Sequence, residues 1–236
     1  MSKKAESTSK KISETDQNLI NPTGHFSMVR NFQLADLITL LNGVCGAMSI
    51  FSNMRYLVSN DPKDLYTAMG FMPFGLFFDF MDGRVARWRN RSSLLGQELD
   101  SLADVISFGV APAALAFTVG MRTTLDTLIL TYFVSCGIAR LARFNATVAL
   151  LPKDNTGKIS HFEGLPIPSS LGLVAVLAYL VIGKGLLHAD QFPYGVIDLA
   201  QLVGVDSKLG QVHAFTLLFA IQGTAMVSKT LKIPKP

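Results

Sequence analysis

The chain has 236 residues, of which 49% are hydrophobic and only 16% are charged, and its formal net charge is +4. Its mean hydropathy of +0.36 is too high for an ordinary soluble domain. The basic residues do not alternate with aromatic ones in the manner of a nucleic-acid-binding surface, so we expect no nucleic acid among its partners.

Residues 1–24 form a polar segment rich in Ser, Thr and Lys. The segment lacks the apolar stretch that a cleavable signal peptide requires. Its composition is typical of a disordered chain. We therefore expect a disordered cytosolic tail.

The next segment, 25–34, reads HFSMVRNFQL and places Phe26, Val29 and Phe32 at intervals of three residues. This spacing puts the three side chains on one side of a helix. It predicts a short amphipathic helix lying at the membrane surface. An irregular lead-in to the first span is the alternative.

Four stretches further along contain no Asp, Glu, Lys or Arg: 37–54, 105–121, 164–183 and 209–228. Runs of roughly 18–20 such residues span a bilayer as a helix. With two weaker stretches added, we expect an all-α integral membrane bundle of six transmembrane helices. The predicted spans are about 35–58, 64–82, 99–120, 124–145, 168–187 and 210–230.

The basic residues orient these spans. If the N-terminus is cytosolic, most of the 21 Lys and Arg residues lie on the cytosolic side. The exceptions are Arg55, Lys63, Arg122, Lys184 and Lys208. The positive-inside rule therefore places both termini in the cytosol, including a short tail at 231–236, together with the loop between spans two and three.

This loop and its flanks carry the most informative pattern, DFMDGRVARWRNRSSLLGQELDSLAD at 79–104. Asp79 and Asp82 end one span and share a helix face, and Asp100 and Asp104 share a face at the start of the next. One carboxylate inside a membrane costs about 2.5–3.5 kcal/mol on the gentler scale. Because four would repel one another, we expect two divalent cations, and hard oxygen ligands favour Mg²⁺ or Mn²⁺. Helix capping and pairing with the nearby arginines is the alternative.

The residues between the two aspartate pairs fit a phosphate ligand. Gly83 and Ala86 are small enough for a ligand to approach the backbone. Arg87 offers a planar fork that suits a phosphate group. Gly96 gives the loop room to turn into the next helix.

The whole pattern, D-x2-D-G-x2-A-R-x8-G-x3-D-x3-D, resembles the motif of the CDP-alcohol phosphotransferases. The resemblance covers a six-span domain at 35–230. It implies that two metal ions, held by the four aspartates, bind the pyrophosphate of a CDP-linked lipid. It further implies that Asp104 takes the proton of the attacking alcohol and that the chain pairs as a homodimer. The lipid-nucleotide site would comprise Asp82, Gly83, Ala86, Arg87 and Gly96.

The motif does not name the acceptor alcohol, on which the stretch GIARLARFN at 137–145 bears. Arg140 and Arg143 lie three residues apart at the cytosolic end of span four, and Phe144 follows. Arginine binds a carboxylate through two parallel hydrogen bonds, which favours an amino-acid acceptor over inositol or choline. The alternative is that these are ordinary basic residues flanking a span.

A second stretch, HFEGLPIPSS at 161–170, precedes span five. Pro166 and Pro168 stiffen it, and Gly164 permits a tight turn. It could close over the acceptor, with Glu163 facing an ammonium group, or it is a simple loop-to-helix junction. Asn42, in span one, either lines the nucleotide pocket or is a buried polar residue satisfied by a neighbouring helix.

Together with residues 25–43, these two stretches are similar to the fungal type of CDP-diacylglycerol-dependent phosphatidylserine synthases. That resemblance implies CDP-diacylglycerol and L-serine as substrates and the endoplasmic reticulum as location. Two alternatives stay open: another acceptor, inositol first, or a divalent-cation transporter, since membrane carboxylates also line ion paths. A transporter should carry its acidic groups near the midplane, whereas these lie at one rim.

Overall fold

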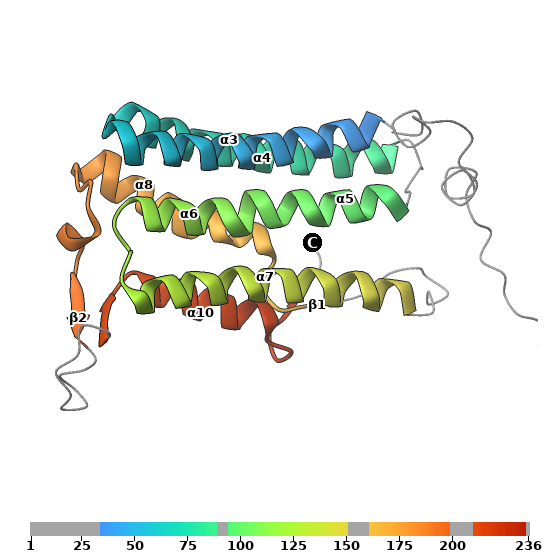
Figure 1. Ribbon diagram of the computed structural model, residues 1–236. Coiled ribbons are helices and arrows are strands. Elements are labelled where there is room, and N and C mark those ends of the chain that lie inside the picture. Colours follow the sequence, from blue (N-terminus) through green and yellow to red (C-terminus); the bar gives the residue numbers. More distant parts are fainter. Residues whose placement is uncertain (1–33, 89–93, 151–160, 199–209, 235–236) are drawn as a thin grey trace, which may run out of the picture.

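The computed structural model describes residues 34–88, 94–150, 161–198 and 210–234. The predicted tail at 1–24 and all but the last residue of the predicted surface helix at 25–34 lie outside them. Long helices run side by side in a bundle (Figure 1). The α-helices are α3 (Leu34–Ser59), α4 (Pro62–Trp88), α5 (Leu94–Asp104), α6 (Ala111–Thr118), α7 (Thr124–Leu150), α8 (Leu171–Ala178) and α10 (Thr216–Val227). Two π-helices, η1 (Val105–Val110) and η3 (Tyr179–Gly183), and two 3₁₀ turns, η2 (Ile167–Ser170) and η4 (Ala189–Gln191), continue or connect them.

Among the described residues, three helical segments are long and apolar enough to cross a membrane: Leu34–Ser59, Leu95–Thr118 and Thr124–Ala146. The second of these joins α5, η1 and α6. Two further apolar helices, Ile167–Gly183 and Thr216–Val227, are shorter. At 1.5 Å per residue α10 is about 18 Å long, against about 30 Å for the hydrocarbon core of a bilayer. The mostly helical fold is confirmed, and the count of six spans stays a prediction.

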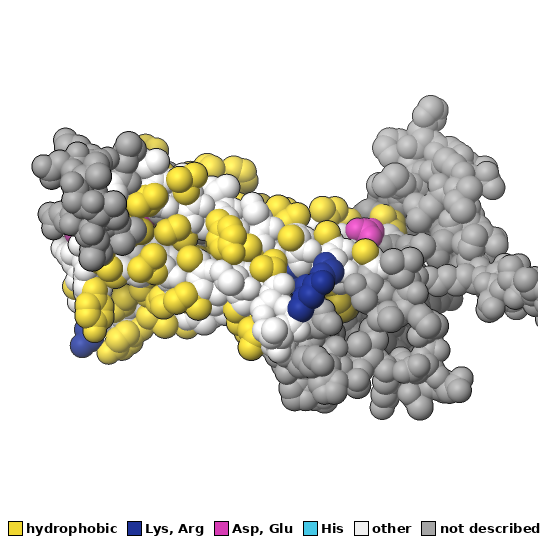
Figure 2. All heavy atoms as spheres, turned by 90° about the horizontal axis from the view of Figure 1, so that it is seen from below, with side chains coloured by type: hydrophobic (Ala, Val, Ile, Leu, Met, Phe, Trp, Pro, Cys, Tyr) yellow, Lys and Arg dark blue, Asp and Glu magenta, His cyan; other side chains and the backbone are white. Residues whose placement is uncertain are grey.

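Helix α3 buries polar side chains and exposes apolar ones. Asp36, Thr39 and Asn42 are at most 4% exposed, whereas Val44 and Phe51 are 53% and 59% exposed. A helix on the surface of a soluble protein has the opposite polarity. Figure 2, which views the bundle of Figure 1 from below, shows hydrophobic side chains spread over the described part of that face. This surface is that of a membrane protein.

The turn between α3 and α4 follows from its local sequence. Asn60 has a positive φ of 54°, a conformation that Asn tolerates better than most residues. Asp61 caps α4, because its carboxylate accepts a hydrogen bond from the Lys63 N–H at 3.0 Å. Pro62 is the first helical residue, where its missing N–H costs nothing. This turn reverses the chain, so the end of α4 returns to the end of the bundle at which α3 begins (Figure 1, right).

Helix α7 begins at the opposite end of the bundle with a capping box. Thr123 N–H donates to Asp126 Oδ2, and Asp126 N–H donates to Thr123 Oγ1, both at 3.1 Å. Asp126 Oδ2 also lies 2.6 Å from His213 Nδ1, and His213 Nε2 lies 3.2 Å from Asp190 Oδ1. His213 is buried and ties strand β3 (Gln211–His213) and η4 to the start of α7. This cluster therefore fastens the end of the bundle that lies away from the four aspartates.

Small residues let α3 approach η1 closely. A β-carbon added at Gly46 would lie 2.6 Å from Ser107 Oγ and 2.8 Å from Ser107 Cα. The Ser107 hydroxyl donates to the Asn42 carbonyl at 2.8 Å. The π-helix begins directly after Asp104, and π-turns within helices are frequent at functional sites. This contact fixes the inner face of α3 against the helix that carries Asp100 and Asp104.

The fold departs from the all-α prediction in two short antiparallel ribbons. Strand β1 (His161–Glu163) pairs with β4 (Lys232–Pro234), and β2 (Val196–Asp198) pairs with β3 (Gln211–His213). The segment 231–236, predicted as a short cytosolic tail, contains the paired strand β4. The sixth predicted span, 210–230, begins with β3 and becomes α-helical only at Thr216. The Asp126 carboxylate accepts a hydrogen bond from the His213 backbone N–H. This bond helps to hold the segment as a strand.

Candidate active site

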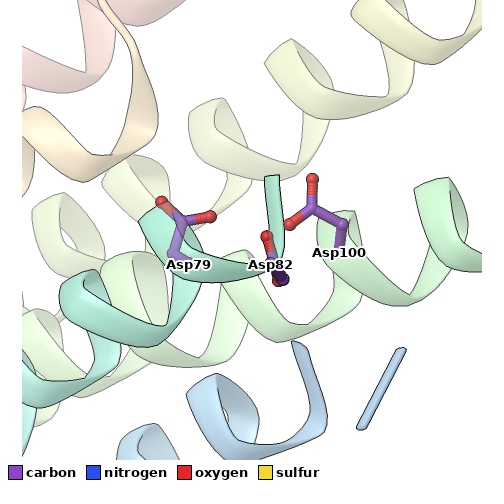
Figure 3. Close-up of side chains that lie close together, drawn as sticks. All are labelled: Asp79, Asp82 and Asp100. Carbon is purple, nitrogen blue, oxygen red and sulfur yellow. The ribbon is translucent and has the colours of Figure 1, made fainter. Parts of the chain in front are cut away.

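Three carboxyl groups from two helices meet at one point. Asp79 and Asp82 lie on α4, and Asp100 lies on α5. One carboxylate oxygen from each lies within 4.8 Å of the other two. Figure 3 shows the three side chains gathered between the two helices. The helical spacing places the members of each pair on one face, and the packing of α4 beside α5 brings the pairs together.

Asp104 lies one helical turn further along α5 and is only 8% exposed. It is within hydrogen-bonding reach of Asp79, and its Oδ1 accepts a hydrogen bond from Asn42 Nδ2 at 3.2 Å. The structure therefore gathers all four aspartates that the sequence singles out.

The cluster fits divalent cations. Asp82 is only 6% exposed, and Asp100 Oδ1 is a buried oxygen without a hydrogen-bond partner among the described residues. Negative charges this close repel one another strongly in a medium of low dielectric constant. Buried charges are stable when they are paired or coordinate a metal. Carboxylate oxygens from several residues suit Mg²⁺ or Mn²⁺.

Helix α3 adds two polar residues that the sequence-based analysis missed. Thr39 Oγ1 donates to Asp82 Oδ2 at 2.5 Å. Asp36, 4% exposed, lies near enough to Asp82 for their charges to interact. Positions 36, 39 and 42 are polar residues spaced three apart in the mostly apolar first half of α3, and this spacing was the available signal.

The residues predicted to bind the lipid-nucleotide lie around the aspartates. Gly83 follows Asp82, and a β-carbon at its position would have no other group of the described chain within 4 Å. Ala86 and Arg87 lie in the last turns of α4, and Gly96 lies near the start of α5; the side chains of Ala86 and Arg87 are outside the described part. Asn42 contacts Asp104 rather than an open surface.

The residues predicted to bind serine are distributed over two elements. Arg140, on α7, lies near enough to Asp104 for their charges to interact, and its Nε has no hydrogen-bond partner in the described part of the chain. Arg143 donates from Nη1 to the Val227 carbonyl at 3.3 Å, at the end of α10. Phe144 is 37% exposed. Glu163 lies on β1, where its backbone pairs with Lys232. The described contacts therefore place Arg140 beside the aspartates.

The chain is similar to known proteins over most of its length. The family model described as CDP-alcohol phosphatidyltransferase matches residues 32–203. A CDP-diacylglycerol–serine O-phosphatidyltransferase from Saccharomyces cerevisiae is 53% identical over 221 residues, 93% of this chain and 77% of that protein. An enzyme of the same name from Bacillus subtilis is 34% identical over 145 residues, 61% of this chain and 73% of that protein. An archaetidylserine synthase from Methanothermobacter thermautotrophicus is 37% identical over 179 residues, 70% of each chain.

Proposed function

The chain belongs to the CDP-alcohol phosphatidyltransferase family, and we propose that it is a CDP-diacylglycerol–serine O-phosphatidyltransferase. It transfers the phosphatidyl group of CDP-diacylglycerol to the hydroxyl of L-serine. The serine oxygen forms a new bond to the phosphorus of the phosphatidyl group, the bond from that phosphorus to CMP breaks, and the serine hydroxyl loses its proton. The relative from Saccharomyces cerevisiae carries this name and is 53% identical.

The four aspartates would hold two divalent cations, Mg²⁺ or Mn²⁺. Bound there, such ions neutralise the diphosphate of CDP-diacylglycerol and stabilise the attacking and leaving oxygens. The mutual proximity of the Asp79, Asp82 and Asp100 oxygens, within 4.8 Å, is the observation that carries this proposal. The lipid-nucleotide would lie along Asp82, Gly83, Ala86, Arg87 and Gly96.

Asp104 is the proposed general base, which accepts the proton of the serine hydroxyl. It lies one helical turn beyond Asp100, is buried and receives one hydrogen bond from Asn42. This hydrogen bond supports a role for Asn42 in orienting Asp104. It gives less support to the predicted contact between Asn42 and the nucleotide.

For the acceptor, we propose that Arg140 binds the serine carboxylate. Its unpartnered Nε and its proximity to Asp104 support this role, and a guanidinium suits a carboxylate. Further contacts with serine are predicted for Arg143, Phe144 and Glu163. Of these, Arg143 already donates to the end of α10.

We further propose that the chain spans the bilayer six times, with the aspartates and both termini in the cytosol. The reversed polarity of α3 and the placement of basic residues support this topology. A homodimer and a location in the endoplasmic reticulum rest on the family resemblance alone.

The test is an acceptor comparison. Purified protein is given CDP-diacylglycerol, Mn²⁺ and radiolabelled L-serine, or radiolabelled inositol in a parallel reaction. We expect label in the lipid phase with serine only. Label with inositol only would keep the chemistry and overturn the acceptor. Label with neither, together with Mn²⁺ uptake into vesicles containing the protein, would favour a transporter.

A further inference from the structure

The hydroxyl of Thr39 makes a short hydrogen bond to an aspartate of the cluster. Its Oγ1 lies 2.5 Å from Asp82 Oδ2 and 3.1 Å from the Ala35 carbonyl. A threonine hydroxyl has a single hydrogen to donate. Because hydroxyl bonds to carboxylates of about 2.5–2.7 Å are charge-assisted and strong, Asp82 is the preferred acceptor.

Asp82 must be correctly oriented to take part in the cluster. It is one of the three residues whose oxygens meet and it is 6% exposed. The terminal torsion of an aspartate side chain has only a broad preference, so the carboxyl group needs a partner to hold it. Thr39, itself 4% exposed, supplies this partner from a different helix.

The position of Thr39 is itself fixed. Asn42 lies three residues further along the same face of α3, where its carbonyl accepts the Ser107 hydroxyl at 2.8 Å. Gly46, one turn beyond, lets α3 lie against Ser107. Since α3 is held against η1, it cannot turn about its axis without breaking these contacts.

We infer that Thr39 is a positioning residue for the metal site: its hydroxyl holds the Asp82 carboxylate facing Asp79 and Asp100 and thereby sets the affinity for divalent cations. The inference rests on the proposed metal-binding role of the aspartates. Groups that orient metal ligands typically change metal affinity or activity by about 10- to 100-fold when removed.

The experiment is a Mn²⁺ titration of the full chain in detergent, without CDP-diacylglycerol or serine, followed by the electron paramagnetic resonance signal of free Mn²⁺. Thr39→Val keeps the shape of the side chain and removes the hydroxyl, and Thr39→Ser keeps the hydroxyl. Thr118→Val is the matched control. Thr118 is equally buried, at 2% exposure, and its hydroxyl donates at 2.7 Å to the carbonyl four residues earlier, as Thr39 can to Ala35.

We expect Thr39→Val to raise the Mn²⁺ dissociation constant about 10- to 100-fold, with Thr39→Ser and Thr118→Val close to wild type. The Michaelis constant for serine should not change in any of them. Wild-type affinity in folded Thr39→Val would overturn the inference, and so would a loss that Thr39→Ser does not restore.

Folding is followed by thermal unfolding, and Thr39→Ala is measured beside Thr39→Val. If both variants unfold while Thr118→Val stays folded, the hydroxyl serves the fold rather than the metal, and the inference is wrong. A wild-type protein that binds Mn²⁺ through Thr39-dependent contacts but does not use serine would refute the proposed acceptor and leave this inference standing.

Discussion

Asn42 Nδ2 donates a hydrogen bond to Asp104 Oδ1 at 3.2 Å, across 62 residues of sequence. The bond joins α3 to the aspartate proposed as the base. Asn42 is fully buried, and its own Oδ1 has no hydrogen-bond partner in the described chain. A β-carbon at Gly75 would lie 3.1 Å from that oxygen. The side chain is thus closely confined, and its amide group has a defined orientation toward Asp104.

Asn42→Ala should lower kcat about 10- to 150-fold, because a lost hydrogen bond to a charged group is worth about 1.5–3 kcal/mol. The Michaelis constant for CDP-diacylglycerol should stay nearly constant, since the amide contacts Asp104. Steady-state kinetics with varied lipid substrate separate the two constants. A raised Michaelis constant for CDP-diacylglycerol with normal kcat would instead show that Asn42 contacts the nucleotide.

Asp104→Asn should reduce turnover by about 10²- to 10⁴-fold, the usual contribution of a general base. The amide is isosteric, so binding of CDP-diacylglycerol should be largely retained. Single-turnover rates and a lipid-nucleotide binding assay measure the two effects. A variant with near-normal turnover would show that another group accepts the proton.

Arg140→Gln should raise the Michaelis constant for serine at least about tenfold, because it removes a charge-assisted contact to the serine carboxylate. Arg143→Gln is the comparison, since its guanidinium donates to Val227. For Arg143→Gln we expect a lower melting temperature and a smaller change in the serine constant. The reverse order of effects would move the acceptor site from Arg140 to Arg143.

The helices and the aspartate motif were predictable because both depend on local spacing. The charge-free run at 37–54 predicted the span 35–58, and the structure has Leu34–Ser59. The weaker stretch at 124–145, which charged residues interrupt, corresponds to Thr124–Leu150. The same-face placement of Asp79 with Asp82 follows from helical periodicity alone. Neither result required knowledge of how one helix packs against another.

The contacts between distant segments were not predictable in this way. Thr39 meets Asp82 only because of the relative rotation of α3 and α4, which a single sequence does not reveal. The pairing of β1 with β4 joins residues around 162 and 233. Strands of this length are shorter than the roughly four to eight residues over which alternation identifies a strand. The different contacts of Arg140 and Arg143 were not predictable either, because both are arginines at the same end of one span. They differ in the structure because Arg143 donates to Val227 at the end of α10.

Gly46→Ala should destabilise the protein by about 1–3 kcal/mol, the usual cost of overpacking, because the added methyl group would overlap Ser107. Turnover should also fall, since Asn42 lies one turn away. Gly70→Ala is the control: a β-carbon there has nothing of the described chain within 4 Å, so a gain of about 0.5–1 kcal/mol is expected for an interior helical glycine. Thermal unfolding in one detergent compares the two, and equal melting temperatures would argue against close packing of α3 on η1.

The central claim is that the four aspartates jointly bind the divalent ions that the transfer requires. Its most direct test is the rate of phosphatidylserine formation from CDP-diacylglycerol and L-serine, measured after chelation and then at increasing Mn²⁺, in wild type and Asp82→Asn. We predict no product after chelation, saturable recovery in wild type, and recovery in Asp82→Asn only at much higher Mn²⁺ or not at all. Undiminished product formation in the chelated enzyme, or an identical Mn²⁺ dependence in the two proteins, would contradict the claim.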